Sequence, residues 1–498
     1  MKNIRYYFSF VCLGLLGCQY DFPEDASPDP NPGQADFTKI VAVGDAISAG
    51  FMDGALYNRG QENSFVNILA GQMKLAGGGE LIQPDINSEN GYFSMGPNNT
   101  VLGRLVLSVN PATGATGPAP IGPGDLPAPF TGEKSQLNDF GVPGITLGTA
   151  LIPDTGNPAS PLFNPYYSRM ASNPGASTLV GDAAAAMANG GTFFSFWLGN
   201  NDVLGYATGG ASNPAILTED AAFQTRLNAG LGAFLNANPE ANGVIMNFPN
   251  LNTLPHFNLI NPLGIQVPAS ARAELGAGIG QLNAAINGWN QGVNSNPQIP
   301  DAVKATLLRP TLSTNFDTYA LLILDPTLSD AEIPLPTGGT FVIPKIRNLR
   351  ETDGVKIPLG AQTSLAQGVG LSPLAPLNET QYDAVYLTLP EQEEIQGKIN
   401  TFNGFITGAV SANEDRLLLV DVNDFMNRVL EGRISSGNVG LTPSIIPPTG
   451  GFSLDGIHPN ARSHAFIANL IIEGINEKWD ANLTPVNPNS YPGNDLPR

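Results

Sequence analysis

Short apolar runs alternate along the chain with longer segments whose apolar residues recur every three or four positions. The short runs are mostly apolar, which is typical of strands buried on both faces of a parallel sheet. They cover residues 39–44, 192–198, 243–248 and 417–422. Segments with helical spacing cover residues 65–73, 182–187, 218–236, 390–410 and 461–478. Because the two kinds of segment alternate, the pattern predicts an α/β fold in which helices flank one parallel sheet.

The helix predicted over 218–236 carries sequence signals at its start. Thr218 is expected to cap it, and Glu219 and Asp220 would lie in the first turn, where negative charge is favourable. Its apolar residues form one stripe, which should face the core.

Two long segments do not follow the alternation. Residues 75–135 are dense in Gly, Pro and Asn and contain short β-like runs. Residues 258–385 combine a helix expected over 270–290 with β-like runs at 319–325 and 340–344. Loops of this length in a compact domain are usually functional. We therefore predict two insertions in a single domain, the second packed beside or over the sheet.

The start of the chain has the features of an export signal. Lys2 and Arg5 precede an apolar segment that is too short to span a membrane. The run Leu15-Leu16-Gly17-Cys18 resembles a bacterial lipobox. Residues 1–17 would then be a lipoprotein signal peptide and Cys18 the lipidated first residue of the mature protein. The alternative is an ordinary secretory signal that happens to contain a cysteine.

Acyl chains on Cys18 would hold the protein at a membrane without a transmembrane helix. Residues 18–36 are rich in Pro and acid and predict an extended tether. Acid close after the cysteine resembles the surface-export signal of Bacteroidetes lipoproteins, so the expected location is the outer membrane, at the cell surface. The folded domain is expected over 37–480, followed by a C-terminal tail at 481–498.

Charge and cysteine content narrow the functional classes. The formal net charge is −20 and there is no basic run, which makes nucleic acid a poor candidate partner. The second cysteine, Cys12, lies in the predicted signal peptide, so the mature chain has no thiol pair for a disulfide or a zinc site. We expect no metal and no cofactor, because His and Cys residues form no cluster along the sequence.

Polar turns follow the predicted strands, at the sheet edge where α/β proteins place their chemistry. One of them contains Asp455 three residues before His458. A tight turn there would let the carboxylate bind and orient the imidazole, as in a catalytic base. The commoner outcome for this spacing is an Asp-Gly turn followed by an exposed histidine. His464 is expected to be a helix-packing or surface residue and His256 to pack in a loop.

Four of these segments resemble, in order, the four blocks of the SGNH/GDSL hydrolases. The segments are Gly44-Asp45-Ala46-Ile47-Ser48-Ala49-Gly50, Gly141-Val142-Pro143-Gly144, Gly199-Asn200-Asn201-Asp202 and Asp455-Gly456-Ile457-His458. The flanking residues 51–57 and 60–65 are similar to those of Bacteroidetes-type SGNH lipoproteins. The resemblance implies a three-layer α/β/α SGNH-type fold with a central parallel sheet, here with two long insertions, and an ester hydrolase activity.

The resemblance also implies a role for each block. His458 would be the base and Asp455 the group that orients it. The oxyanion donors would be the backbone N–H of residue 46, the N–H of Gly144 and the side-chain amide of Asn201. The family has its nucleophilic serine where this chain has Ala46. Ser48 does not replace it, because two residues further on the Cα position and side-chain direction differ.

Two explanations of Ala46 remain at this stage. The chain is a lipid-anchored carboxylic ester hydrolase (an esterase, lipase or acylhydrolase) that lacks its serine through engineering or as a sequence variant. Alternatively, it is a natural non-catalytic pseudoenzyme that binds an acylated ligand or glycan at the cell surface. The retained site residues favour the first. The expected partners are an ester substrate and, through the anchor, the membrane; nothing in the sequence assigns the acyl length.

Overall fold

A computed structural model of the chain describes residues 29–497 except 112–113, 319, 335–337, 374–378 and 438. The predicted signal peptide, Cys18 and the first part of the predicted tether lie outside the described residues. Across the described ranges, no helix combines the length and apolar character needed to cross a membrane.

Five parallel strands form the central sheet in the order β13–β8–β7–β1–β6. The strands are β1 (Ile40–Gly44), β6 (Asp139–Gly141), β7 (Phe193–Trp197), β8 (Asn242–Met246) and β13 (Leu417–Val420). Every residue of β1 and β7 is buried, Ser195 included, which explains why their sequences are almost entirely apolar. The predicted α/β class with a central parallel sheet is confirmed.

The direction in which the chain moves across the sheet reverses beside β1. From β1 the chain crosses to β6 on one side, returns to β7 on the other, and continues outward to β8 and β13. Gly44, the last residue of β1, is in register with Gly141 of β6 and Trp197 of β7. The turns after these three strands therefore start at one level, at a topological switch point of the kind that opens a crevice in α/β sheets.

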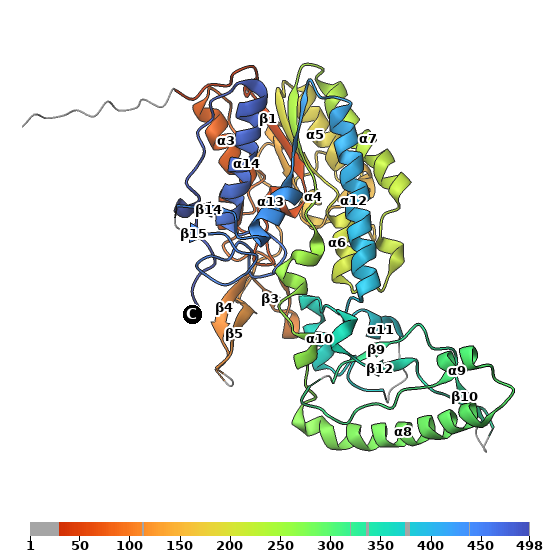
Figure 1. The fold of residues 1–498 in the computed structure, drawn as a ribbon. Coiled ribbons are helices and arrows are strands. Elements are labelled where there is room, and N and C mark those ends of the chain that lie inside the picture. The colour runs from red at the N-terminus through yellow and green to blue at the C-terminus, as the bar shows by residue number, and fades with distance from the viewer. Residues whose placement is uncertain are drawn as a thin grey trace, which may run out of the picture.

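Helices cover both faces of the sheet, as Figure 1 shows. On one side lie α3 (Phe65–Leu75) and α14 (Ala461–Trp479), and on the other lie α5 (Leu179–Ala188), α7 (Asp220–Ala237) and α12 (Leu389–Ser411). All five helices predicted from apolar spacing are present. Phe223 and Phe402 stack at 3.8 Å between ring centroids, which joins α7 to α12. Shorter helices near the site are α1 (Ala46–Ala49), α2 (Asn58–Glu62), α4 (Pro165–Ser168), α6 (Asn201–Thr208) and α13 (Val422–Leu430).

The predicted start of α7 and end of β13 are wrong by a few residues. Thr218 does not cap α7: the N-cap residue is Glu219, and the Thr218 hydroxyl donates to Asp202 Oδ1 at 2.8 Å. The buried carboxylate of Asp202 thus accepts the hydrogen bond of the hydroxyl that was expected to cap α7. The strand β13 ends at Val420, because Asp421 caps α13, which the sequence analysis did not predict.

The described part of the predicted tether, residues 29–36, is packed on the domain. The N–H of Gln34 donates to Trp479 O at 2.7 Å, and Ala35 is buried. This part of the chain donates hydrogen bonds to backbone carbonyl groups at and just after the end of α14. An extended tether would not make these contacts.

The C-terminal tail also packs on the domain. Leu483 is buried, and the Nδ2 atom of Asn494 donates to Ile445 O at 2.7 Å and to Phe452 O at 2.8 Å. The tail therefore supports the loop that leads to Asp455.

The first insertion forms small antiparallel ribbons from β2 (Ser94–Met95), β3 (Val101–Leu102), β4 (Leu105–Val109) and β5 (Thr116–Pro120). A similar ribbon, β14 (Ser435–Ser436) with β15 (Val439–Gly440), precedes the last loop.

The second insertion, residues 258–385, forms a lobe that Figure 1 shows below α6 and α12. Its helices are α8 (Arg272–Ser295), α9 (Asp301–Leu307), α10 (Gln362–Ala366) and α11 (Glu379–Asp383). Its strands are β9 (Leu322–Leu324), β10 (Glu332–Pro334), β11 (Thr340–Val342) and β12 (Ile346–Asn348). The lobe is filled by two apolar clusters of its own. It therefore lies beside the sheet and adds little to the central core.

Candidate active site

A cavity opens at the carboxyl ends of β1, β7 and β8. Its wall includes Ala46, Asn201 and His458, which come from three of the four segments singled out in the sequence. Asp455 binds His458 from behind, whereas Gly144 does not line this cavity. The fold thus brings together positions far apart in the chain. Asp455 and Gly144 both lie outside the wall, but Asp455 contacts it through His458, whereas Gly144 is exposed on a neighbouring loop.

The turn after β1 places Ala46 at the first position of α1. Asp45 caps this short helix: its Oδ1 accepts from Ile47 N at 3.1 Å, and its Oδ2 accepts from Asn200 Nδ2 at 2.8 Å. Burial raises the pKa of Asp45 to about 6, although both hydrogen bonds act in the opposite direction. Because the first N–H groups of a helix have no partner within it, the N–H of Ala46 is available to a ligand.

Ser48 lies beneath the end of β1. Its side chain is fully buried, and its Oγ is 1.9 Å from the position that a Cβ on Gly44 would occupy. Gly44 must therefore be glycine for Ser48 to pack there. Ser48 does not line the cavity.

His458 and Asp455 form a close pair within a tight turn. His458 Nδ1 lies 2.9 Å from Asp455 Oδ2, and the other carboxylate oxygen accepts from the backbone N–H groups of Ile457 at 2.8 Å and His458 at 2.9 Å. An ionised carboxylate can only accept hydrogen bonds, so Nδ1 carries the proton and Nε2 remains free to take another. This is the arrangement of a base and the group that orients it.

The charges of the pair reinforce each other. Burial alone would lower the pKa of His458, but the negative charge of Asp455, with a smaller contribution from Asp45, raises it above its ordinary value. Burial alone would raise the pKa of Asp455, but His458 and the backbone donors hold it well below its usual range. Asp455 therefore stays ionised and stabilises a protonated imidazole.

The other two histidines have structural surroundings. His464 is buried, its Nδ1 accepts from Phe65 N at 3.1 Å, and burial lowers its pKa to about 3. The backbone N–H of His256 donates to Gly456 O at 2.9 Å, and its Nδ1 lies 3.3 Å from Asp455 O. Burial lowers the pKa of His256 as well. His256 therefore braces the turn that carries the Asp455 carboxylate.

The turn after β7 is joined to the loop after β6. Asn201 Nδ2 donates to Ile145 O at 2.8 Å, and Asp202 Oδ2 accepts from Leu147 N at 2.7 Å. Gly144, at φ +74°, is exposed on this loop. One hydrogen of the Asn201 amide is thus used to hold the loop, and the second remains for a ligand in the cavity.

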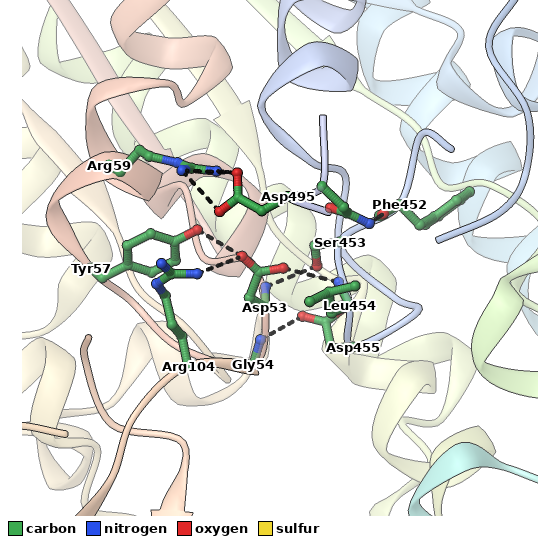
Figure 2. A network of polar contacts seen from close by, with 11 residues as sticks. Asp53, Gly54, Tyr57, Arg59, Arg104, Phe452, Ser453, Leu454, Asp455 and Asp495 are labelled. Carbon is green, nitrogen blue, oxygen red and sulfur yellow. Dashed lines mark hydrogen bonds and ion pairs between the residues drawn. The ribbon is translucent and has the colours of Figure 1, made fainter. Parts of the chain in front are cut away.

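A network of polar contacts ties the segment after α1 to the turn that carries His458 (Figure 2). Asp53 lies at its centre: its N–H donates to Ser453 Oγ at 3.0 Å, its Oδ1 accepts from Leu454 N at 3.0 Å, and its Oδ2 accepts from Tyr57 Oη at 2.8 Å. Asp53 is buried and has a φ of +56°. A residue other than glycine keeps that conformation only where its surroundings fix it.

The same network reaches the pair of Asp455 and His458 directly. The N–H of Gly54 donates to Asp455 Oδ2 at 2.9 Å (Figure 2), and the same oxygen lies 2.9 Å from His458 Nδ1. Arg104 lies 3.8 Å from Asp53 and balances its charge. The network therefore fixes the orientation of Asp455.

Asn200 and Asp53 received no role from the sequence. Both lie within segments that resemble the family, and each is a polar residue that the fold buries against another polar group. Their burial depends on contacts with distant segments. The local sequence therefore gave no signal that these two residues stabilise the site.

Among the residues that the structure describes, no three His, Cys, Asp or Glu side chains are grouped so that they could hold a metal ion. Comparison of the chain with family models, curated proteins and solved structures finds no match. The geometry of the site and the resemblance of its four segments are therefore the features that point to a function.

Proposed function

We propose that the chain carries the ester-hydrolase site of an SGNH-type fold, with Ala46 at the nucleophile position. The observation that supports this most directly is the pair of His458 and Asp455: its Nδ1 proton is bound by the carboxylate, and the ring lines the same cavity as Ala46. A buried histidine whose ring is oriented by a carboxylate, and whose pKa that carboxylate raises, has no evident structural purpose.

With a serine at position 46, the proposed reaction follows from these positions. The hydroxyl oxygen attacks the ester carbonyl while Nε2 of His458 takes its proton, and Asp455 stabilises the resulting imidazolium. The oxyanion accepts hydrogen bonds from the N–H of residue 46 and the amide of Asn201, with Gly144 as a third candidate donor. The protonated His458 then gives its proton to the leaving alcohol, and a water molecule activated by the same base releases the acid.

The chain with Ala46 has no oxygen for this attack. Loss of one member of such a triad lowers the rate of hydrolysis by about 10⁴- to 10⁶-fold, while substrate binding is retained. Ala46 itself therefore favours a second candidate function, a pseudoenzyme that binds an acylated ligand or glycan without cleaving it.

Replacement of Ala46 with serine separates the two functions. Ala46→Ser should hydrolyse short p-nitrophenyl esters at least 10³-fold faster than the parent, by analogy with measured triad deletions. Ala46→Ser combined with Ser48→Ala is the matched control and should keep the activity, because Ser48 lies outside the cavity. A folded Ala46→Ser protein no faster than the parent would contradict the hydrolase proposal. Ester binding by the parent that is unchanged in His458→Ala would then support the pseudoenzyme.

We also propose that acyl chains on Cys18 hold the protein at the outer membrane, facing the cell surface. The support is the lipobox-like run and the acidic residues after it. Cys18→Ala should move the protein from the membrane fraction to the soluble fraction. Mass spectrometry of the N-terminal peptide would show the acyl chains directly, and an unmodified Cys18 would contradict the proposal.

A further inference from the structure

A second cavity lies directly behind the candidate site and shares part of its wall. Ile47, Pro249, Leu254 and Ile457 line both cavities. Ile47 is the neighbour of Ala46 in the chain, and Ile457 is the neighbour of His458. The second cavity therefore begins beside the two positions to which the proposed function assigns the nucleophile and the base.

The wall of this second cavity is apolar. Helix α13 supplies Val422, Phe425, Met426 and Val429, which fall at i, i+3, i+4 and i+7 and so form one helix face. Ser463 brings a hydroxyl to the wall, but this hydroxyl donates to Gly451 O at 2.6 Å and is already satisfied. A cavity of this kind holds water poorly and binds apolar groups.

We propose that this cavity is an acyl chamber: it takes the acyl chain of an ester whose carbonyl lies beside Ala46. The substrate class is then an ester of a medium-chain fatty acid. The inference rests on the proposed function for the position of the ester group. It goes beyond that function because neither the triad nor the oxyanion donors require an apolar cavity behind Ile47 and Ile457.

The size of the acyl chamber sets the expected chain length. The volume open to the centres of water-sized spheres is about 50 Å³. One water needs about 10–15 Å³ on this measure, so the chamber has room for roughly four methylene groups beyond the site cavity. Each methylene that leaves water for such a site should strengthen binding about fourfold. Affinity should therefore rise with chain length to about the hexanoyl or octanoyl ester and then level off.

Binding to the parent protein tests the chamber, since Ala46 prevents turnover during the measurement. The probes are methyl esters of butanoic, hexanoic, octanoic and dodecanoic acid, titrated by calorimetry. We expect about a fourfold gain per methylene up to the plateau. Equal affinity for all four esters would overturn the proposal.

Two variants that change the chamber in opposite directions make the test specific. Met426→Trp fills it and should reduce the gain per methylene to less than twofold, whereas Asn427→Trp, on the exposed side of the same helix, should behave as the parent. Phe425→Leu enlarges the chamber and should move the plateau to longer chains, which keeps the test decisive if Met426→Trp does not fold. A folded Met426→Trp or Phe425→Leu protein with the chain-length profile of the parent would exclude the chamber as the binding site.

Failure of the chamber can be distinguished from failure of the proposed function. Chain-length-dependent binding by the parent together with an inactive Ala46→Ser would contradict hydrolysis and support the chamber. Active Ala46→Ser with binding that does not depend on chain length would contradict the chamber alone.

Discussion

The sheet domain and the lobe at 258–385 use different means to hold together. The sheet domain has one continuous apolar core that extends to the wall of the candidate site, and the site itself is built from turns at adjacent strand ends. The lobe has two smaller clusters, short antiparallel ribbons and a charged group in which Arg347 contacts Asp325 and Asp353. No residue of the described lobe lines the site cavity.

The two regions nevertheless meet at a loop of the site. Lys356 of the lobe donates to Asn252 O, which lies outside the lobe, and to Oδ1 of Asn258, the first residue of the lobe, at 2.9 Å. The loop that carries Asn252 follows β8 and also supplies Leu251 and Leu254 to the cavity wall. Chemistry and lobe stability should therefore be separable, with a small coupling through Lys356.

The largest effect is expected at the base. In the Ala46→Ser background, His458→Gln should lower kcat for ester hydrolysis by about 10⁴, because Nε2 no longer accepts the nucleophile's proton. Thermal unfolding should change little. His464→Gln is the control, since His464 does not line the cavity. Equal losses in both variants would indicate that the effect comes from folding.

The second effect concerns the lobe alone. The side chains of Arg347, Asp325 and Asp353 are 14%, 16% and 13% exposed, and their ion pairs measure 3.0 and 2.7 Å. Arg347→Met leaves two largely buried carboxylates without the cation that pairs with them, which should destabilise the lobe by about 3 kcal/mol. Denaturant unfolding should show an earlier lobe transition, while Ala46→Ser activity stays within twofold. A comparable loss of activity would show that the site depends on lobe folding.

A third prediction addresses the network around Asp53. Asp53→Ala removes the acceptor of Leu454 N–H and Tyr57 Oη–H, and should lower Ala46→Ser kcat about 30-fold because Asp455 loses its fixed orientation. KM should change much less. Tyr57→Phe removes only one hydrogen bond of the network and should have a smaller effect on kcat. A change confined to stability or KM would contradict the positioning role.

The pH dependence should reflect the raised pKa of His458. The base must be neutral to act, so Ala46→Ser activity should rise about tenfold per pH unit below that pKa and level above it, at a pH above the ordinary 6.5 of histidine. The contribution of this pair to folding stability should change in the opposite direction with pH. The stabilisation from this pair is complete below 6.5 and is lost as the pH rises through the raised pKa of His458. An activity midpoint below 6.5 would contradict the electrostatics of the pair; Arg347→Met should leave the midpoint unchanged.

The sequence predicted the sheet domain better than the lobe or the finer parts of the site. Continuous apolar runs and helical stripes recur wherever one core is shared, and they located β1, β7, β8, β13 and the helices that cover them. The strand β6 was missed because Asp139 is one of its three residues, buried with its carboxylate bound by Gln83 Nε2 at 3.0 Å. Helix α13 was missed because Val422 was assigned to the preceding strand.

Within the site, contacts between residues close in the sequence could be predicted, whereas contacts between distant segments could not. Asp455 and His458 are three positions apart, which made their pairing a candidate, and the resemblance of the four segments favoured it over an exposed histidine. The contact of Asn200 with Asp45 and the place of Asp53 beneath the 453–455 turn depend on segments far apart in the chain. Gly144 shows the converse, because a motif position does not guarantee a place in the cavity wall.

The smallest effect is expected where the two regions meet. Burial lowers the pKa of Lys356, so its contacts with Asn258 and Asn252 only partly offset the loss of water around the ammonium group. Lys356→Met should therefore change lobe stability by less than about 1 kcal/mol and raise KM of Ala46→Ser about two- to threefold, because the loop after β8 becomes less fixed. Lys345→Met, which removes a lobe ion pair on the surface, is the matched control and should leave KM unchanged. A loss of kcat in Lys356→Met would show that the lobe takes part in the chemistry, and the separation between the two regions would then be wrong.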